Sequence, residues 1–83
     1  MNFIPKYIST QTTTIITTKD TGILHSVVIG ETSAGAITIS DGTGTIAVLK
    51  ASIAEGTYLF DVAYQGNLTV VTAGASKITV SYN

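Results

Sequence analysis

Hydrophobic residues along the chain fall in short runs separated by turn-forming residues, which is the pattern of β-strands. The run Gly22–Gly30 is rich in β-branched residues and has glycine at both ends, so it predicts a strand. Strict alternation divides this run between two mainly apolar faces: Ile23, His25, Val27 and Ile29 on one, Leu24, Ser26 and Val28 on the other. Strands covered on both sides have this composition. We therefore expect Gly22–Gly30 to be the central strand, with its second face covered from elsewhere, for example by another subunit.

Further runs bring the number of predicted strands to about seven. Thr57–Tyr64 alternates most clearly, and four large side chains are expected to share its core face: Tyr58, Phe60, Val62 and Tyr64. The others are Thr10–Thr18, Ala36–Ser40, Thr45–Lys50, Leu68–Thr72 and Lys77–Tyr82. Short strands with regular turns and no amphipathic helix predict an all-β fold. We expect a single antiparallel β-sandwich of jelly-roll or Greek-key topology.

Two other segments have a recognisable character. Residues 1–9 have mixed polarity and hold the only proline, Pro5, which cannot donate a hydrogen bond within a central ladder. We expect residues 1–9 to form an extended N-terminal arm suited to lie on a neighbour, and residues 10–83 to form the β-sandwich domain. The string Asp41-Gly42-Thr43-Gly44 predicts a tight hairpin in which the Asp-Gly step supplies the positive φ.

Charged residues are few. They make up 11% of the chain, against about 25% in an average soluble domain, and the net charge is −1. This composition lacks the basic surface that binds nucleic acid. Mean hydropathy is +0.43, yet no apolar run approaches the ~20 residues of a membrane helix. We expect neither a nucleic acid nor a membrane as partner.

The size of the chain limits its own stability. A single domain of 83 residues has a small core, and small scaffolds usually need an additional source of stability. A disulfide is excluded because the chain has no cysteine, and a zinc site is disfavoured because it has one histidine. Homo-oligomerisation, or docking on a larger assembly, is the source that remains.

Side chains that carry chemistry are scattered along the chain. His25 lacks the sequence neighbours that nucleophilic catalysis or metal binding requires, so a hydrogen-bonded core or interface histidine is favoured. Asp20-Thr21-Gly22 matches the catalytic triplet of aspartic proteases, but polar residues replace the apolar strand that leads into it, and a turn is favoured. The sequence predicts no enzyme activity, no catalytic residue, no cofactor and no metal site.

Several blocks resemble those of small all-β virion structural proteins of tailed bacteriophages: Ala36–Gly42, Ile46–Lys50, Gly56–Val62, Leu68–Thr72 and Ile78–Tyr82. The likeness extends over Gly22–Tyr82 and does not include Met1–Thr21. It implies a structural component of the phage particle, of the capsid decoration (cement) or head-fibre type. It also implies localisation in the virion, and in the host cytoplasm during assembly, with the major capsid protein or other virion proteins as partners.

The leading hypothesis is a capsid decoration protein that binds and stabilises the assembled coat lattice through β-sandwich oligomer contacts. The alternative is a small head-fibre or tail component that binds a host-surface glycan through loops such as Glu31–Gly35 or Asp41–Gly44. In the leading hypothesis the arm and the central strand make the contacts. The candidate interface residues are Phe3, Ile4, Tyr7, Leu24, His25 and Val28.

Overall fold

The computed structural model describes residues 3–83, and all of their regular secondary structure is β-strand. The prediction of an all-β chain is therefore confirmed. Residues 3–83 form eight strands, one more than predicted: β1 (Ile4–Ile8), β2 (Thr12–Thr17), β3 (Thr21–Glu31), β4 (Ile37–Asp41), β5 (Gly44–Leu49), β6 (Gly56–Gln65), β7 (Leu68–Thr72) and β8 (Lys77–Tyr82). The additional strand is β1, because each of the other seven overlaps a predicted run.

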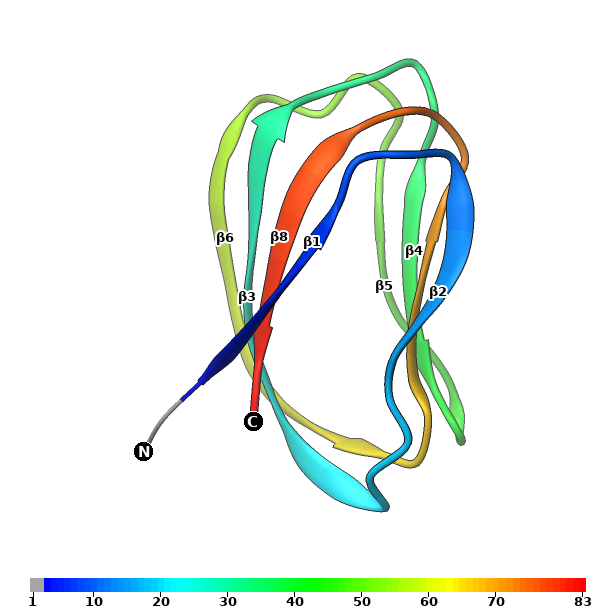
Figure 1. Cartoon of the computed structure of the whole chain (residues 1–83), viewed down its shortest axis with the longest axis vertical. Coiled ribbons are helices and arrows are strands. Elements are labelled where there is room, and N and C mark those ends of the chain that lie inside the picture. The colour runs from blue at the N-terminus through cyan, green and yellow to red at the C-terminus, as the bar shows by residue number, and fades with distance from the viewer. Residues whose placement is uncertain (1–2) are drawn as a thin grey trace.

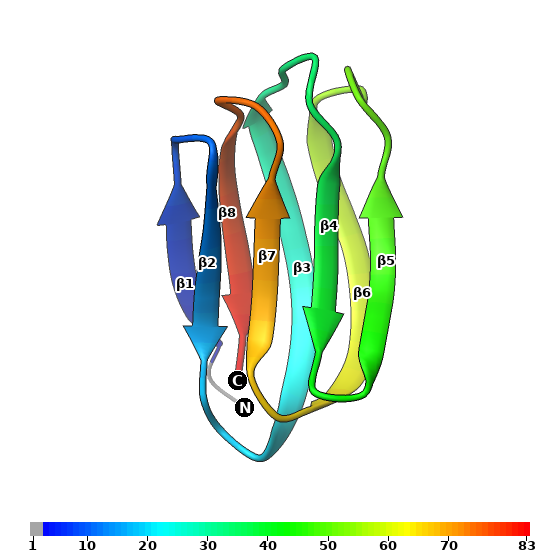
Figure 2. The same cartoon turned by 90° about the vertical axis from the view of Figure 1, so that its right-hand side faces the viewer.

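The strands form two four-stranded sheets that face each other (Figure 1). One sheet has the order β1-β8-β3-β6 and the other β2-β7-β4-β5, and every pairing is antiparallel. The chain crosses from one sheet to the other at every connection except β4–β5, which is a hairpin within one sheet (Figure 2). Strands at equal distances from this hairpin pair with each other: β4 with β5, β3 with β6, β2 with β7 and β1 with β8. The chain is thus one long hairpin wound into two layers.

The core fills the space between the two sheets. Every strand contributes at least one buried apolar side chain: Ile8, Ile16, Leu24, Val27, Ile29, Ile37, Ile39, Leu49, Tyr64, Leu68, Val70, Ile78 and Val80. The predicted core stripe of β6 is confirmed. Tyr64 is fully buried, and Tyr58, Phe60 and Val62 pack against the core. Leu59, on the opposite face of β6, is 68% exposed.

The central position of β3 is also confirmed, because this strand lies between β8 and β6. Its two faces, however, do not follow strict alternation. The pairing register shifts between Leu24 and Ser26, and Leu24 consequently shares the inward face with Val27 and Ile29. A bulge resets the two-residue period of a strand, so a pattern counted from one end assigns the residues beyond the bulge to the wrong face.

The segment predicted as an extended arm is an edge strand in the structure. Ile4–Ile8 pairs with β8 along its length, from Ile4 opposite Tyr82 to Ile8 opposite Ile78. An edge strand accommodates Pro5 because the missing backbone N–H can lie on the solvent side. The two-layered fold therefore begins at Ile4 rather than at residue 10. Met1 and Asn2, also assigned to the arm, lie outside the described residues.

The β4–β5 hairpin forms where the sequence predicts it, but Gly42 does not supply the positive φ, which occurs at Gly44 (143°). The Asp41 carboxylate closes the turn by accepting hydrogen bonds from the backbone N–H groups of Thr43 (2.8 Å) and Gly44 (3.2 Å). Gly42 is required instead for close approach. Its N–H donates to the carbonyl oxygen of Gln65 at 2.8 Å, and a Cβ atom here would lie 2.7 Å from that oxygen. The hairpin tip is thereby fixed against the connection between β6 and β7.

Candidate docking surface

The solvent side of the β1-β8-β3-β6 sheet carries most of the residues that the sequence predicts for an interface. Outward positions alternate with core positions on each strand. Tyr7 of β1 and Leu59 of β6 are 61% and 68% exposed, and Val28 of β3 lies between these strands. We call this side the outer face. It includes Phe3, Pro5, Tyr7, Ile23, His25, Val28, Leu59 and Asp61.

Three side chains from distant parts of the chain meet on the outer face. The ring of Phe3, which precedes β1, stacks on the imidazole of His25 in β3, with ring centroids 4.1 Å apart and planes inclined by 14°. Nδ1–H of His25 donates to Oδ1 of Asp61 in β6 at 2.6 Å. An ionised carboxylate can only accept, so this bond fixes a proton on Nδ1. This Phe3–His25–Asp61 cluster extends from one edge of the sheet to the other.

Irregularities in two strands bring His25 and Asp61 together. Leu24 and Ser26 of β3 pair with Val62 and Leu59 of β6, so β6 has one residue more than β3 in this stretch. Asp61 lies there and has a φ of 49°. Residues other than glycine rarely adopt this backbone conformation, and among them Asp and Asn tolerate it best. His25 lies at the corresponding register shift of β3. Bulges re-aim side chains in this way, and here both side chains point to the same part of the outer face.

Two ion pairs lie on this sheet, while Lys6 of β1 takes part in neither. Besides the His25–Asp61 contact, Nζ of Lys77 lies 3.4 Å from Oε2 of Glu31 where β8 begins and β3 ends. All four side chains are at least one third exposed, so the pairs contribute little to the free energy of unfolding. Their consequence is electrostatic, because an approaching partner meets a surface of low charge density.

The six predicted interface residues divide into three groups. Phe3, Tyr7, His25 and Val28 lie on the outer face. Ile4 is 51% exposed, but it lies opposite Tyr82 on the core side and therefore at the open margin of the sheet. Leu24 is 0% exposed in the core, because the register shift turns it inward, so it is unavailable for an interface.

The predicted interface residues leave out four residues of the outer face: Pro5, Ile23, Leu59 and Asp61. Leu59 could have been found, because the alternation of Thr57–Tyr64 puts it opposite the aromatic stripe. Asp61 is recognisable from the sequence as a pairing or interface residue, because it is acidic and lies in the middle of an apolar strand. Nothing in the sequence indicates its partner, since His25 is 36 residues away.

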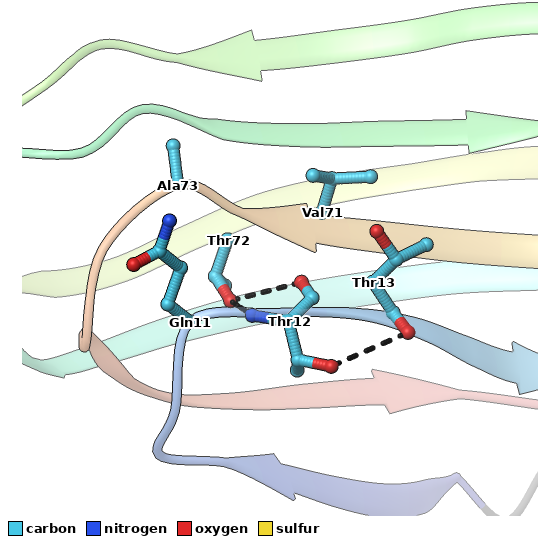
Figure 3. A pocket seen from close by; sticks show the side chains of 6 residues that line it. All are labelled: Gln11, Thr12, Thr13, Val71, Thr72 and Ala73. Carbon is cyan, nitrogen blue, oxygen red and sulfur yellow. Dashed lines mark hydrogen bonds between the residues drawn. The ribbon is translucent and has the colours of Figure 1, made fainter.

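The opposite sheet carries a shallow pocket of about 380 Å³ beside β2 and β7 (Figure 3). Its lining is uncharged and contains no aromatic side chain: Gln11, Thr12, Thr13, Val71, Thr72 and Ala73. The Thr72 hydroxyl accepts a hydrogen bond from the Thr12 N–H (3.0 Å) and donates to the Thr10 carbonyl oxygen (2.7 Å), so it serves the fold. The pocket thus offers no titratable group for acid–base chemistry.

Residues 3–83 contain no cluster of three or more His, Cys, Asp or Glu side chains placed to hold a metal ion. The same part of the chain contains no helix long and apolar enough to cross a membrane. No model of a known protein family matches the chain, and no curated protein matches it. The resemblance to phage virion proteins therefore stays a prediction.

Proposed function

We propose that this chain is a structural protein of a phage particle, a capsid decoration protein that docks on the assembled coat through its outer face. A protein that binds only the assembled lattice stabilises that state by mass action. Copies that also contact one another bind with avidity, so each contact needs only modest affinity. The observation that carries the proposal is the outer face itself, where exposed apolar side chains lie among paired charges.

The winding of the chain supports a jelly roll as the finer topology of the two layers. A jelly roll has eight strands in two sheets, and here strands at equal distances from the β4–β5 hairpin pair across the chain. Viral capsid domains and lectin domains both use this topology. The topology is therefore compatible with the decoration hypothesis and with the glycan-binding alternative.

Side-chain exposure favours protein docking over glycan binding. Tyr7 and Leu59 are more than half exposed, and burying such a side chain against a partner is worth about 1.5–3 kcal/mol. Tyrosine is also enriched at protein interfaces. A glycan-binding head-fibre or tail component is less well supported. Small-molecule sites usually include aromatic side chains, and none lies in the loops Glu31–Gly35 and Asp41–Gly44 or lines the Gln11–Thr13 pocket.

The proposal is tested by binding to coat particles assembled without this chain. The double variant Tyr7→Ser/Leu59→Ser removes the two most exposed apolar side chains of the outer face. We expect its affinity for the particles to fall about tenfold or more, since ~1.4 kcal/mol corresponds to a factor of ten. Cosedimentation at a series of protein concentrations measures the change.

The opposite sheet offers a matched control. Ile15 and Val48 are 57% and 59% exposed in β2 and β5, so Ile15→Ser/Val48→Ser removes two apolar side chains of comparable fractional exposure from the other side of the molecule. Wild-type affinity is expected for this variant. Equal weakening by both double variants, or by neither, would contradict docking through the outer face. A glycan bound on an array and lost with Gln11→Ala would favour the alternative.

A further inference from the structure

The edge strands of the two sheets determine how copies of this chain can associate by strand pairing. An exposed edge strand is a template for pairing with a second chain, and proteins guard such edges with proline, charge or bulges. The edge strands here are β1 and β6 in one sheet and β2 and β5 in the other. In β1 the guard is Pro5 followed by Lys6.

Each of the other three edge strands carries a bulge. The register shifts give β2 an extra residue at Ile16 relative to β7, and β5 an extra residue at Ile46 relative to β4. The extra residue of β6 lies between Leu59 and Val62. All four edges of the described fold therefore resist simple addition of a strand from another copy. Exchange of a strand avoids this barrier, because it re-forms an existing pairing.

One strand is suited to exchange. The strand that exchanges most simply is the first or last strand of a fold and lies at an edge of a sheet. Among the strands of residues 3–83 only β1 meets both conditions, because β8 lies between β1 and β3. Of the five residues in β1, only Ile8 is buried, and β1 pairs with β8 alone. Its removal therefore uncovers less of the core than removal of any interior strand.

The contacts beside β1 define where the chain would open. The Thr72 hydroxyl bonds the Thr12 N–H and the Thr10 carbonyl oxygen, which fixes the beginning of β2 to β7. The hinge is therefore exposed Ser9, between buried Ile8 and this anchor. The opposite end of β1 is held by the stack of Phe3 on His25, whose ring is oriented by Asp61.

We propose that β1 is exchanged between two copies of this chain, so that β1 of each copy pairs with β8 of the other. Every contact of the β1–β8 pairing and the stack of Phe3 on His25 is then re-formed between chains rather than within one. The exchange leaves Pro5 and Lys6 on the open edge, which keeps further copies from adding there. A two-fold exchange closes on itself and gives a dimer. This inference rests on the part of the proposed function in which copies of the chain contact one another. It identifies β1 as the segment that joins two copies.

A disulfide can report which chain supplies β1, because the protein has no cysteine of its own. Tyr7 and Thr79 are directly opposite each other in the β1–β8 pairing, within the reach of a disulfide. The variant Tyr7→Cys/Thr79→Cys is refolded under reducing conditions at a series of concentrations, then oxidised and separated without reductant. We expect disulfide-linked dimers, whose ratio to monomer rises about tenfold per tenfold increase in concentration while dimer is scarce.

The control pair is Thr38→Cys/Val71→Cys, which joins β4 to β7 in the other sheet. Exchange of β1 leaves this pairing within one chain, so only monomeric disulfides are expected. Pro5→Cys/Ser81→Cys repeats the measurement at a second position of the β1–β8 pairing, for the case that the first variant does not fold. Disulfides confined to single chains in the β1–β8 variants at every concentration would overturn the exchange.

The native mass of the wild-type protein, measured by sedimentation, separates the two proposals. A dimer whose β1–β8 disulfides stay within single chains means that copies associate through their faces, and only the exchange fails. If the wild-type protein has the mass of a monomer at all concentrations, both the exchange of β1 and the proposed homo-oligomer are contradicted. Particle binding is measured separately, so its loss with exchange intact would overturn the decoration function alone.

Discussion

A side chain at Gly22 would collide with two groups that close one end of the β1-β8-β3-β6 sheet. The buried hydroxyl of Tyr64 donates a hydrogen bond to the carbonyl oxygen of Asn83 at 2.8 Å. A Cβ atom on Gly22 would lie 2.5 Å from that hydroxyl and would also contact the Asn83 oxygen. Glycine is required here by the close approach of its neighbours, since its φ is not in the left-handed region.

We expect Gly22→Ala to lower the free energy of unfolding by about 1–3 kcal/mol, the usual cost of forcing a methyl group into a packed site. Chemical denaturation followed by circular dichroism measures the change. Gly30→Ala in the same strand is the control, because its nearest contact would be the Lys77 carbonyl oxygen at an ordinary 3.5 Å. We expect that variant to stay within about 1 kcal/mol of wild type. Equal losses in both variants would mean that strand glycines matter for another reason.

At the scale of single residues, alternation predicts the faces of β6 but not those of β3, although both strands are irregular near the His25–Asp61 contact. On β6 the aromatic stripe is on the core side and Leu59 is exposed, as alternation requires. On β3 the same rule fails for Leu24, because the bulge near His25 resets the period. A bulge depends on how a strand pairs with its neighbours, and this register cannot be predicted from the residues of one strand alone.

Among the connecting elements, the β4–β5 hairpin depends on one carboxylate. Asp41 accepts hydrogen bonds from the Thr43 hydroxyl (2.7 Å) and from the backbone N–H of Gln65 (2.9 Å), besides those within the turn. These donors lower the pKa of Asp41 from 3.8 to about 2, with the Thr43 hydroxyl as the largest cause. A lowered pKa means that the folded protein favours the ionised form.

The pH dependence of stability follows from this shift. The contribution of Asp41 is fully present above the ordinary pKa near 4, and it is lost as the pH falls towards 2. We expect Asp41→Asn to make the unfolding midpoint less dependent on pH between about 4 and about 2 than in wild type. Thermal melts across this range measure it. Asp20→Asn is the control. The backbone carbonyl oxygen of Asp20 accepts a hydrogen bond from the Gly66 N–H, and this contact does not involve the side chain that is changed. A wild-type slope in Asp41→Asn would refute this role.

At the scale of elements, seven of the eight strands are readable from the sequence, and β7 and β8 match the predicted runs residue for residue. The missing strand is β1, where Pro5 and Lys6 suppress the usual signal of an apolar run. Those residues are the ones that an edge strand tolerates, so the same side chains that mark an edge also conceal the strand. The order of the strands within each sheet depends on how the whole chain folds, so no short stretch of sequence predicts it.

At the scale of the whole molecule, the low charge of the outer face has a measurable consequence. Because two ion pairs leave little net charge near this face, the proposed docking should depend little on attraction between opposite charges. We expect the affinity for coat particles to change less than about threefold between ~0.05 and ~0.5 M salt, a range that screens exposed charges strongly. Cosedimentation at several salt concentrations measures it. A loss of about tenfold or more would indicate an electrostatic interface.

The Phe3–His25–Asp61 cluster shows the limit of prediction for the candidate site. Sequence reasoning selected Phe3 and His25 separately, as apolar or interfacial residues of the arm and the central strand. Their contact depends on β1 joining the sheet beside β8, and the contact of His25 with Asp61 depends on the bulged pairing of β3 with β6. Both conditions come from tertiary pairing, which a single sequence does not display.

The pairing of Ile4 with Tyr82 brings the beginning of β1 and the end of β8 to the same pole of the molecule (Figure 1). An affinity tag or a fluorescent domain attached directly before Phe3 or after Asn83 would lie close to Phe3 and His25, where its bulk would shield the neighbouring side chains. The connection between β5 and β6 lies at the far pole, and Ala51 and Ser52 there are exposed. Reporters inserted between them would leave the ends of the chain unobstructed.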